Sequence, residues 1–126
     1  MTCFWDAILS SMSSDDFKLL GLNDHSRKNF IIKLKELNKP PNTLWNNTEL
    51  REQEKIEHVE AVKCYNIVGI SNGHLTSICD SFLLLISDLL NINITHRYCS
   101  HFITYKCQVP RKTLSFKSNT QHFSVE

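Results

Sequence analysis

The sequence is poor in residues that loosen or interrupt a fold. Its 126 residues include only 3 Gly and 3 Pro, too few for long flexible linkers, and no low-complexity segment is visible. The longest apolar run, Phe82 to Ile86, is far shorter than the roughly 18 residues that suggest a membrane span. We therefore expect a single domain over residues 1–126 and no membrane partner.

An excess of charge of one sign is also missing. The 14 Lys and Arg residues nearly balance 13 Asp and Glu residues, so no net field attracts the chain to nucleic acid, although a local patch of the folded surface can still be basic. The N-terminus lacks a charged segment followed by an apolar one, the mark of a secretory signal. Five cysteines cannot all pair internally, which favours a reducing, intracellular location, most simply the cytoplasm.

Helical periodicity dominates the first two thirds of the chain. We expect helices over residues 3–12, about 30–37, 48–65 and 82–90. The candidate caps of the second helix are Asn23, Asp24 and Ser26. Asn47 is the expected cap of the third helix, and Ser77 and Asp80 have the spacing of a capping box before the fourth.

After residue 90 the hydrophobic pattern changes to a period of two. Alternation over 92–98 predicts one strand, and β-branched and aromatic residues over 101–107, 113–116 and 122–125 predict three more. Helices thus come first and a small, mainly antiparallel sheet comes last. This order predicts an α+β fold in which N-terminal helices pack on one sheet.

One thiol and one imidazole stand at the ends of these predicted elements. Cys3 opens the first helix, where the macrodipole and unpaired backbone N–H groups stabilise a thiolate. His122 opens the last strand. A thiolate nucleophile needs a base within hydrogen-bond reach and N–H donors for the developing oxyanion. The order of the two elements is typical of papain-like hydrolases and indicates Cys3 as nucleophile and His122 as general base.

Four sequence blocks carry a resemblance to a known family. Residues 2–8, Thr-Cys-Phe-Trp-Asp-Ala-Ile, are similar to a block of Asp-Gly-Asn-Cys, an aromatic residue or Leu, and a helical Ala-Ile pair. Residues 26–30 stand where the family has a helix of Leu, Arg and Val, and residues 75–93 resemble its helix-then-strand unit. Residues 113–123 are similar to its closing strand and its His followed by an aromatic residue. In this order the blocks resemble the ovarian tumour (OTU) family of deubiquitinating cysteine proteases.

The resemblance implies an activity and a partner. Cys3 would attack the carbonyl carbon of an isopeptide or peptide bond after the tail of ubiquitin or a ubiquitin-like protein, and His122 would protonate the leaving amine. It implies neither a cofactor nor a metal, and it leaves the oligomeric state open.

The chain departs from the family's pattern in two places. The family orients its His through an acidic or amide residue just before the Cys or two places after the His, where this chain has Ser124. The third catalytic residue is therefore unknown, with Asn119 and Glu126 as candidates outside the matching positions. Only two residues precede Cys3, so we expect the domain to lack the N-terminal loop that supplies oxyanion donors in the family.

Three other interpretations stay open. The chain could be a non-catalytic ubiquitin-binding module of the same fold. It could also be a viral self-processing protease acting in the host cytoplasm, for which His101 is the alternative base. A zinc site is the third interpretation, although its spacing lacks the tight pairs typical of zinc ligands. Its ligands would be His96, Cys99, His101 and Cys107.

Overall fold

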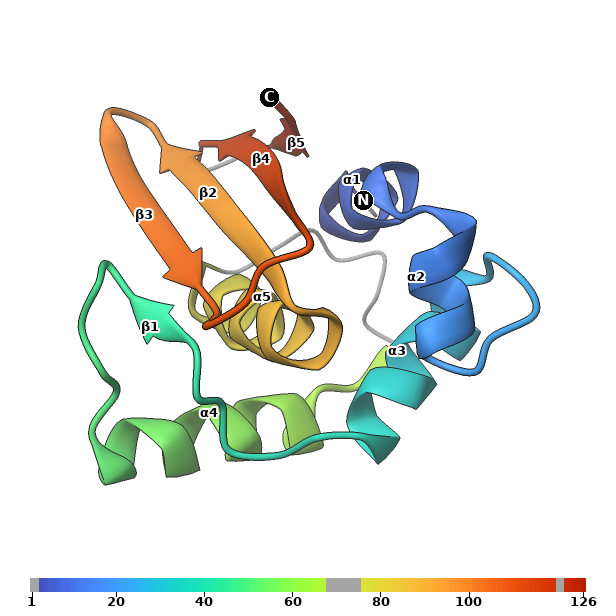
Figure 1. Ribbon diagram of the computed structural model, residues 1–126, viewed down its shortest axis with the longest axis horizontal. Helices are drawn as coiled ribbons and strands as arrows, with labels where there is room; N and C mark the ends of the chain where they lie inside the picture. Colours follow the sequence, from blue (N-terminus) through green and yellow to red (C-terminus); the bar gives the residue numbers. More distant parts are fainter. Residues whose placement is uncertain (1–2, 68–75, 120–121) are drawn as a thin grey trace.

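The computed structural model describes residues 3–67, 76–119 and 122–126, with the backbone alone at 76–78. The helices in these ranges are α1 (Cys3–Ser11), α2 (Ser14–Leu19), α3 (Arg27–Glu36), α4 (Glu52–Cys64) and α5 (Thr76–Leu90). The strands are β1 (Leu44–Trp45), β2 (Ile92–Tyr98), β3 (His101–Lys106), β4 (Lys112–Ser118) and β5 (Phe123–Val125). Helices and one sheet confirm the α+β class (Figure 1). Within the described ranges, no helix is long and apolar enough to cross a membrane.

The five strands form one mixed sheet in the order β1-β3-β2-β4-β5. Three of the neighbouring pairs are antiparallel, as the sequence predicted, but β2 and β4 at the centre are parallel. The start of β4 is fixed beside the start of β2 because the backbone N–H of Arg111 donates to the Asn91 carbonyl at 2.7 Å. The side chain of Arg111 also donates to the carbonyl of Leu90 at 2.8 Å.

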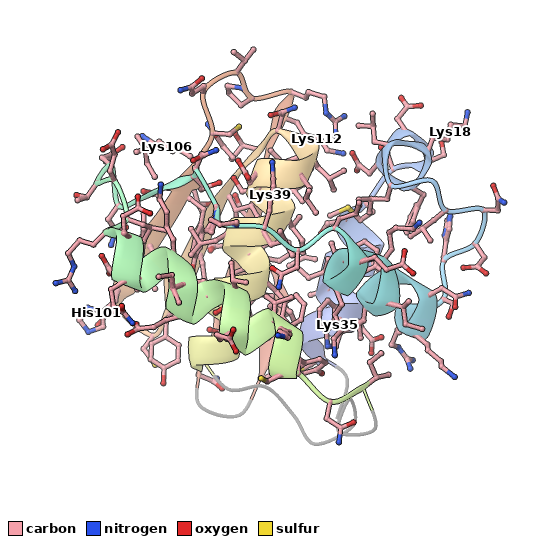
Figure 2. The ribbon with its side chains drawn as sticks, turned by 90° about the horizontal axis from the view of Figure 1, so that it is seen from below. Lys18, Lys35, Lys39, His101, Lys106 and Lys112 are labelled. Atoms are coloured by element: carbon pink, nitrogen blue, oxygen red, sulfur yellow. The ribbon has the colours of Figure 1, made fainter. Side chains whose placement is uncertain are left out.

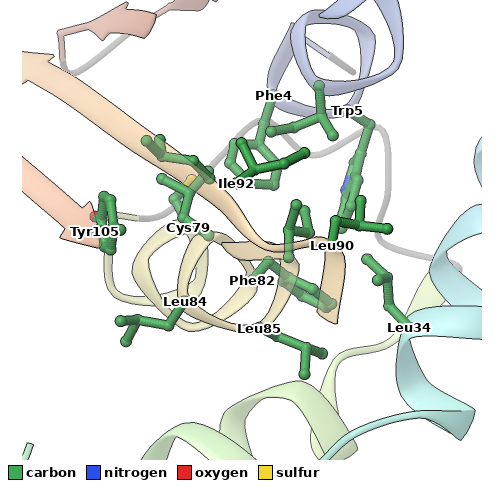
Figure 3. Packing of buried hydrophobic residues seen from close by; sticks show 14 of the residues in the cluster. Phe4, Trp5, Leu34, Cys79, Phe82, Leu84, Leu85, Leu90, Ile92 and Tyr105 are labelled. Atoms are coloured by element: carbon green, nitrogen blue, oxygen red, sulfur yellow. The ribbon is translucent and has the colours of Figure 1, made fainter. Parts of the chain in front are cut away.

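The core lies between α5 and one face of the sheet, and α1 closes it at the β5 edge (Figure 3). Phe82 of α5 is fully buried, and its ring meets the ring of Trp5 edge-on at 4.8 Å. Phe4 meets Phe123 of β5 in the same way, also at 4.8 Å. Burying each such aromatic side chain removes a large apolar area from water, so these contacts hold α1 against the sheet.

Two predicted helix starts are wrong. The third predicted helix begins at Glu52, because Asn46 and Asn47 adopt left-handed φ values of 51° and 65° in a turn whose ends, Trp45 and Thr48, pair with each other. Asn tolerates this conformation, so Asn47 is a turn residue and not a cap. The fourth predicted helix begins at Thr76, so Asp80 lies inside it and does not complete a capping box.

The helix α2 was not expected from the sequence. Ser13 caps it: the Ser13 hydroxyl accepts from the Asp16 N–H at 3.3 Å, and the Asp16 carboxylate accepts from the Ser13 N–H at 2.8 Å. The second predicted helix, by contrast, is confirmed as α3, and of its three candidate caps Ser26 holds the role.

Asp80 forms a buried polar pair with Tyr105 of β3, whose hydroxyl donates to its carboxylate. Burial raises the pKa of Asp80, and the Tyr105 hydrogen bond only partly opposes this. Just above pH 3.8, the ordinary pKa of an Asp side chain, the folded state still holds a proton on Asp80 that the unfolded state has released. The free energy of unfolding therefore falls as the pH rises above this value. We expect Asp80→Asn to be more stable than the wild type at pH 7, and its urea unfolding to vary less between pH 4 and pH 7.

The matched variant is Tyr105→Phe, which removes only the hydroxyl. It leaves the carboxyl of Asp80 buried without this donor, so it should lower the stability at pH 7. An Asp80→Asn protein less stable than the wild type at pH 7 would show that the carboxylate contributes to folding.

Candidate active site

The structure brings together two elements from opposite ends of the chain. Helix α1 packs against β5, as Figure 1 shows, and the rings of Phe4 and Phe123 are 4.8 Å apart. Cys3 is the first residue of α1, and His122 directly precedes β5. The predicted nucleophile and base are therefore the chain neighbours of the two residues whose rings are in contact.

Cys3 is half-buried at the first turn of α1 and packs against the core. Cys79 of α5 lies among the buried residues of the core (Figure 3), and it is 2% exposed. Burial raises the pKa of the Cys79 thiol well above its ordinary value, and the nearby Asp80 and Cys3 add to this effect. A buried thiol that resists ionisation is a poor nucleophile. Of these two thiols, Cys3 is the one suited to attack a substrate.

The backbone of His122 is fixed by Asn119. The His122 N–H donates to the side-chain oxygen of Asn119 at 2.9 Å, and the Asn119 N–H donates to the His122 carbonyl, also at 2.9 Å. Neither bond involves the imidazole, which is exposed to solvent. Asn119 therefore positions the backbone of the predicted base, which is a different role from that of a third catalytic residue bound to the ring.

A cavity of about 310 Å³ lies beside His122. Its lining consists of Arg97, Cys99, Lys117, Ser118, Asn119, His122 and Ser124. Among the residues that the structure describes, Cys3 does not line this cavity. Glu126, the other candidate for the third role, forms an ion pair with Arg97 at 3.1 Å.

The remaining candidates from the sequence are dispersed. His96 is 1% exposed and faces the core, where its Nε2 atom lies 2.6 Å from the Ser118 hydroxyl. The thiol of Cys107 donates to the side-chain oxygen of Asn93 at 3.5 Å. His101 opens β3, which β2 and β4 separate from β5, so the alternative base lies away from α1. Within the described ranges, no three His, Cys, Asp or Glu side chains form a metal-binding group.

Comparison with known proteins identified no relative of this chain. No family model, curated protein or solved structure matches the chain. The candidate site therefore depends on the chain's own residues and geometry.

Sequence reasoning did not identify Arg97 and Lys117 as site residues. Both stand at outward positions of neighbouring strands, opposite each other in the β2–β4 register. The alternation within each strand was visible in the sequence, but the pairing of these two strands was not, because register between distant segments leaves no local pattern.

Proposed function

We propose that the chain is a thiol-dependent hydrolase that cleaves the isopeptide or peptide bond after the C-terminal tail of ubiquitin or a ubiquitin-like protein, inside the cell. The observation that supports this best is the packing of α1 on β5, which brings the helix that begins at Cys3 beside the strand that follows His122. The OTU-like sequence blocks supply the substrate class.

The proposed reaction uses two residues of the chain. The Cys3 sulfur attacks the carbonyl carbon to form a C–S bond, the C–N bond breaks, and His122 gives the leaving amine the proton it took from the thiol. Water then adds to the thioester carbon with His122 as base, which releases the carboxylate and restores the thiol. The imidazole of His122 is exposed to solvent, and catalytic hydrogen bonds often tighten only in the substrate complex.

A ubiquitin probe with an electrophilic group at the end of its tail tests the nucleophile. We expect the probe to form one covalent adduct with the wild-type protein and none with Cys3→Ala, as measured by intact-protein mass. The matched control is Cys64→Ser, because Cys64 is an exposed thiol at the end of α4 and should react no faster than any surface cysteine. An adduct that forms on Cys3→Ala, or is lost from Cys64→Ser, would overturn the assignment.

A non-catalytic ubiquitin-binding module is the second candidate function. It is favoured by one observation: among the described residues, His122 lines a cavity to which Cys3 does not contribute. This candidate requires ubiquitin to bind without forming an adduct. Titration of ubiquitin into the Cys3→Ala protein, alongside the probe reaction of the wild type, separates the two functions.

A further inference from the structure

The outward face of the sheet carries a row of side chains beside His122. In the strand register, Phe102 of β3 stands opposite Arg97 of β2, Arg97 opposite Lys117 of β4, and Lys117 opposite Ser124 of β5. Neighbouring strands lie about 4.8 Å apart, so the side chains of Arg97 and Lys117 start close together on one face. Arg97, Lys117 and Ser124 all line the cavity next to His122.

The cavity is positively charged. Its described lining contains two permanent cations, Arg97 and Lys117, and no acidic residue. Within the described part of the chain, Lys117 forms no ion pair with a carboxylate. Asn119 and Ser124 add an amide and a hydroxyl group that can donate to an anion. Two cations with polar donors in a hollow of this kind favour a negatively charged group over a neutral one.

The chain itself shows which anion fits beside Arg97. The Glu126 carboxylate reaches the Arg97 Nε atom at 3.1 Å, and the two side chains are 39% and 37% exposed. The guanidinium group is thus accessible to a carboxylate from the solvent side. Because this ion pair is exposed to solvent, a carboxylate from another molecule can displace Glu126 at little cost.

We propose that this cavity is a subsite for an acidic side chain of the protein from which ubiquitin is removed, close to the modified lysine. The inference depends on the proposed function in one respect. His122 gives its proton to the leaving amine, so the leaving-group side of the substrate must lie against His122, and the cavity shares that residue. A glutamate or aspartate beside the modified lysine then lies within reach of Lys117 and Arg97.

Two matched conjugates test the subsite. Each joins ubiquitin through its tail to the lysine of a short fluorescent peptide, with Glu on both sides of that lysine in one conjugate and Gln in the other. Turnover by the wild type gives kcat/KM, and fluorescence anisotropy with the Cys3→Ala protein gives Kd without any reaction. We expect the Glu conjugate to bind about fivefold more tightly, and this preference to shrink at about 0.5 M NaCl.

Two charge-removing variants complete the test. Lys117→Gln should reduce the preference for the Glu conjugate to less than about twofold. Lys106→Gln removes the same charge from the outward face of β3, where Lys106 pairs with Leu44 of β1 at the far side of the sheet, and should leave the preference unchanged (Figure 2).

The outcomes separate the subsite from the proposed function. If both conjugates are turned over and have equal Kd values, the subsite is overturned and the proposed hydrolase function is supported. If the Glu conjugate binds more tightly in a way that depends on Lys117, but neither conjugate is turned over, the subsite is supported and the hydrolase function is overturned. An equal loss of preference in Lys106→Gln assigns the effect to net charge and overturns the subsite. If neither conjugate binds at millimolar concentration, both the subsite and the hydrolase function are overturned.

Discussion

Replacing His122 with Ala is expected to lower kcat for hydrolysis of a ubiquitin conjugate by about 10³-fold. The variant lacks the group that takes the proton from the Cys3 thiol and returns it to the leaving amine. Its backbone should stay in place, because the two hydrogen bonds between His122 and Asn119 use the backbone of His122 and not its ring. The exposed ring also contributes little buried area, so the thermal unfolding midpoint should be unchanged.

Added imidazole separates a proton-transfer role from a structural one. A small base that enters the space left by the ring should restore part of the rate of His122→Ala, in proportion to its concentration. The matched control is His101→Ala, which removes another exposed imidazole from the start of β3 and should retain wild-type turnover. If His101→Ala lost activity and His122→Ala kept it, the base would be His101, the alternative considered from the sequence.

The elements that could be predicted from the sequence are those whose own pattern specifies them. The helix that begins at Cys3 and the strand over 92–98 have strong periods of 3.6 and 2, so α1 and β2 match their predictions. Helix α2 has only six residues, too few for a hydrophobic period, although the spacing of Ser13 and Asp16 is that of a capping box. The sequence therefore indicates α2 through its capping residues and not through its hydrophobic pattern.

The candidate site could be predicted only as far as the ends of its elements. Cys3 is the first residue of α1, as predicted, whereas His122 was predicted to open the last strand and lies one residue before β5. The basic cavity depends on the parallel pairing of Arg97 with Lys117, which brings together segments 20 residues apart. Pairing between strands that are not joined by a short turn is a property of the folded sheet and not of either strand's sequence.

Replacing Asp16 with Asn is expected to cost about 3 kcal/mol of the free energy of unfolding at pH 7. Asp16 is fully buried at the start of α2, where its two carboxylate oxygens accept from Arg111 and Lys112, each at 2.6 Å. These cations belong to the segment that opens β4, so one side chain joins α2 to the sheet. The neutral amide fills the same volume, but it leaves two partly buried cations without their counter-charge.

The pH dependence of stability identifies the charge as the cause. Burial alone would raise the pKa of Asp16, but the hydrogen bonds from Arg111 and Lys112, with that from the Ser13 backbone, lower it from 3.8 to about 2. Between these values the unfolded state binds a proton that the folded state does not, so stability falls as pH decreases from about 5 toward 2. The shift corresponds to about 2 kcal/mol of stability, present at pH 7 and lost in acid.

Urea unfolding of the wild type and Asp16→Asn at pH 7, 4 and 2.5 measures this difference directly. The two proteins should differ most at pH 7 and least at pH 2.5, because the stability that depends on the Asp16 charge is lost progressively as the pH falls toward the folded-state pKa of about 2. The matched control is Asp15→Asn, which neutralises the exposed neighbour in the same first turn and should change stability by less than about 0.5 kcal/mol. A constant difference between wild type and Asp16→Asn across this range would assign the effect to packing. Convergence in acid would show that an ion pair, formed between residues 95 apart in the chain, holds α2 to the sheet.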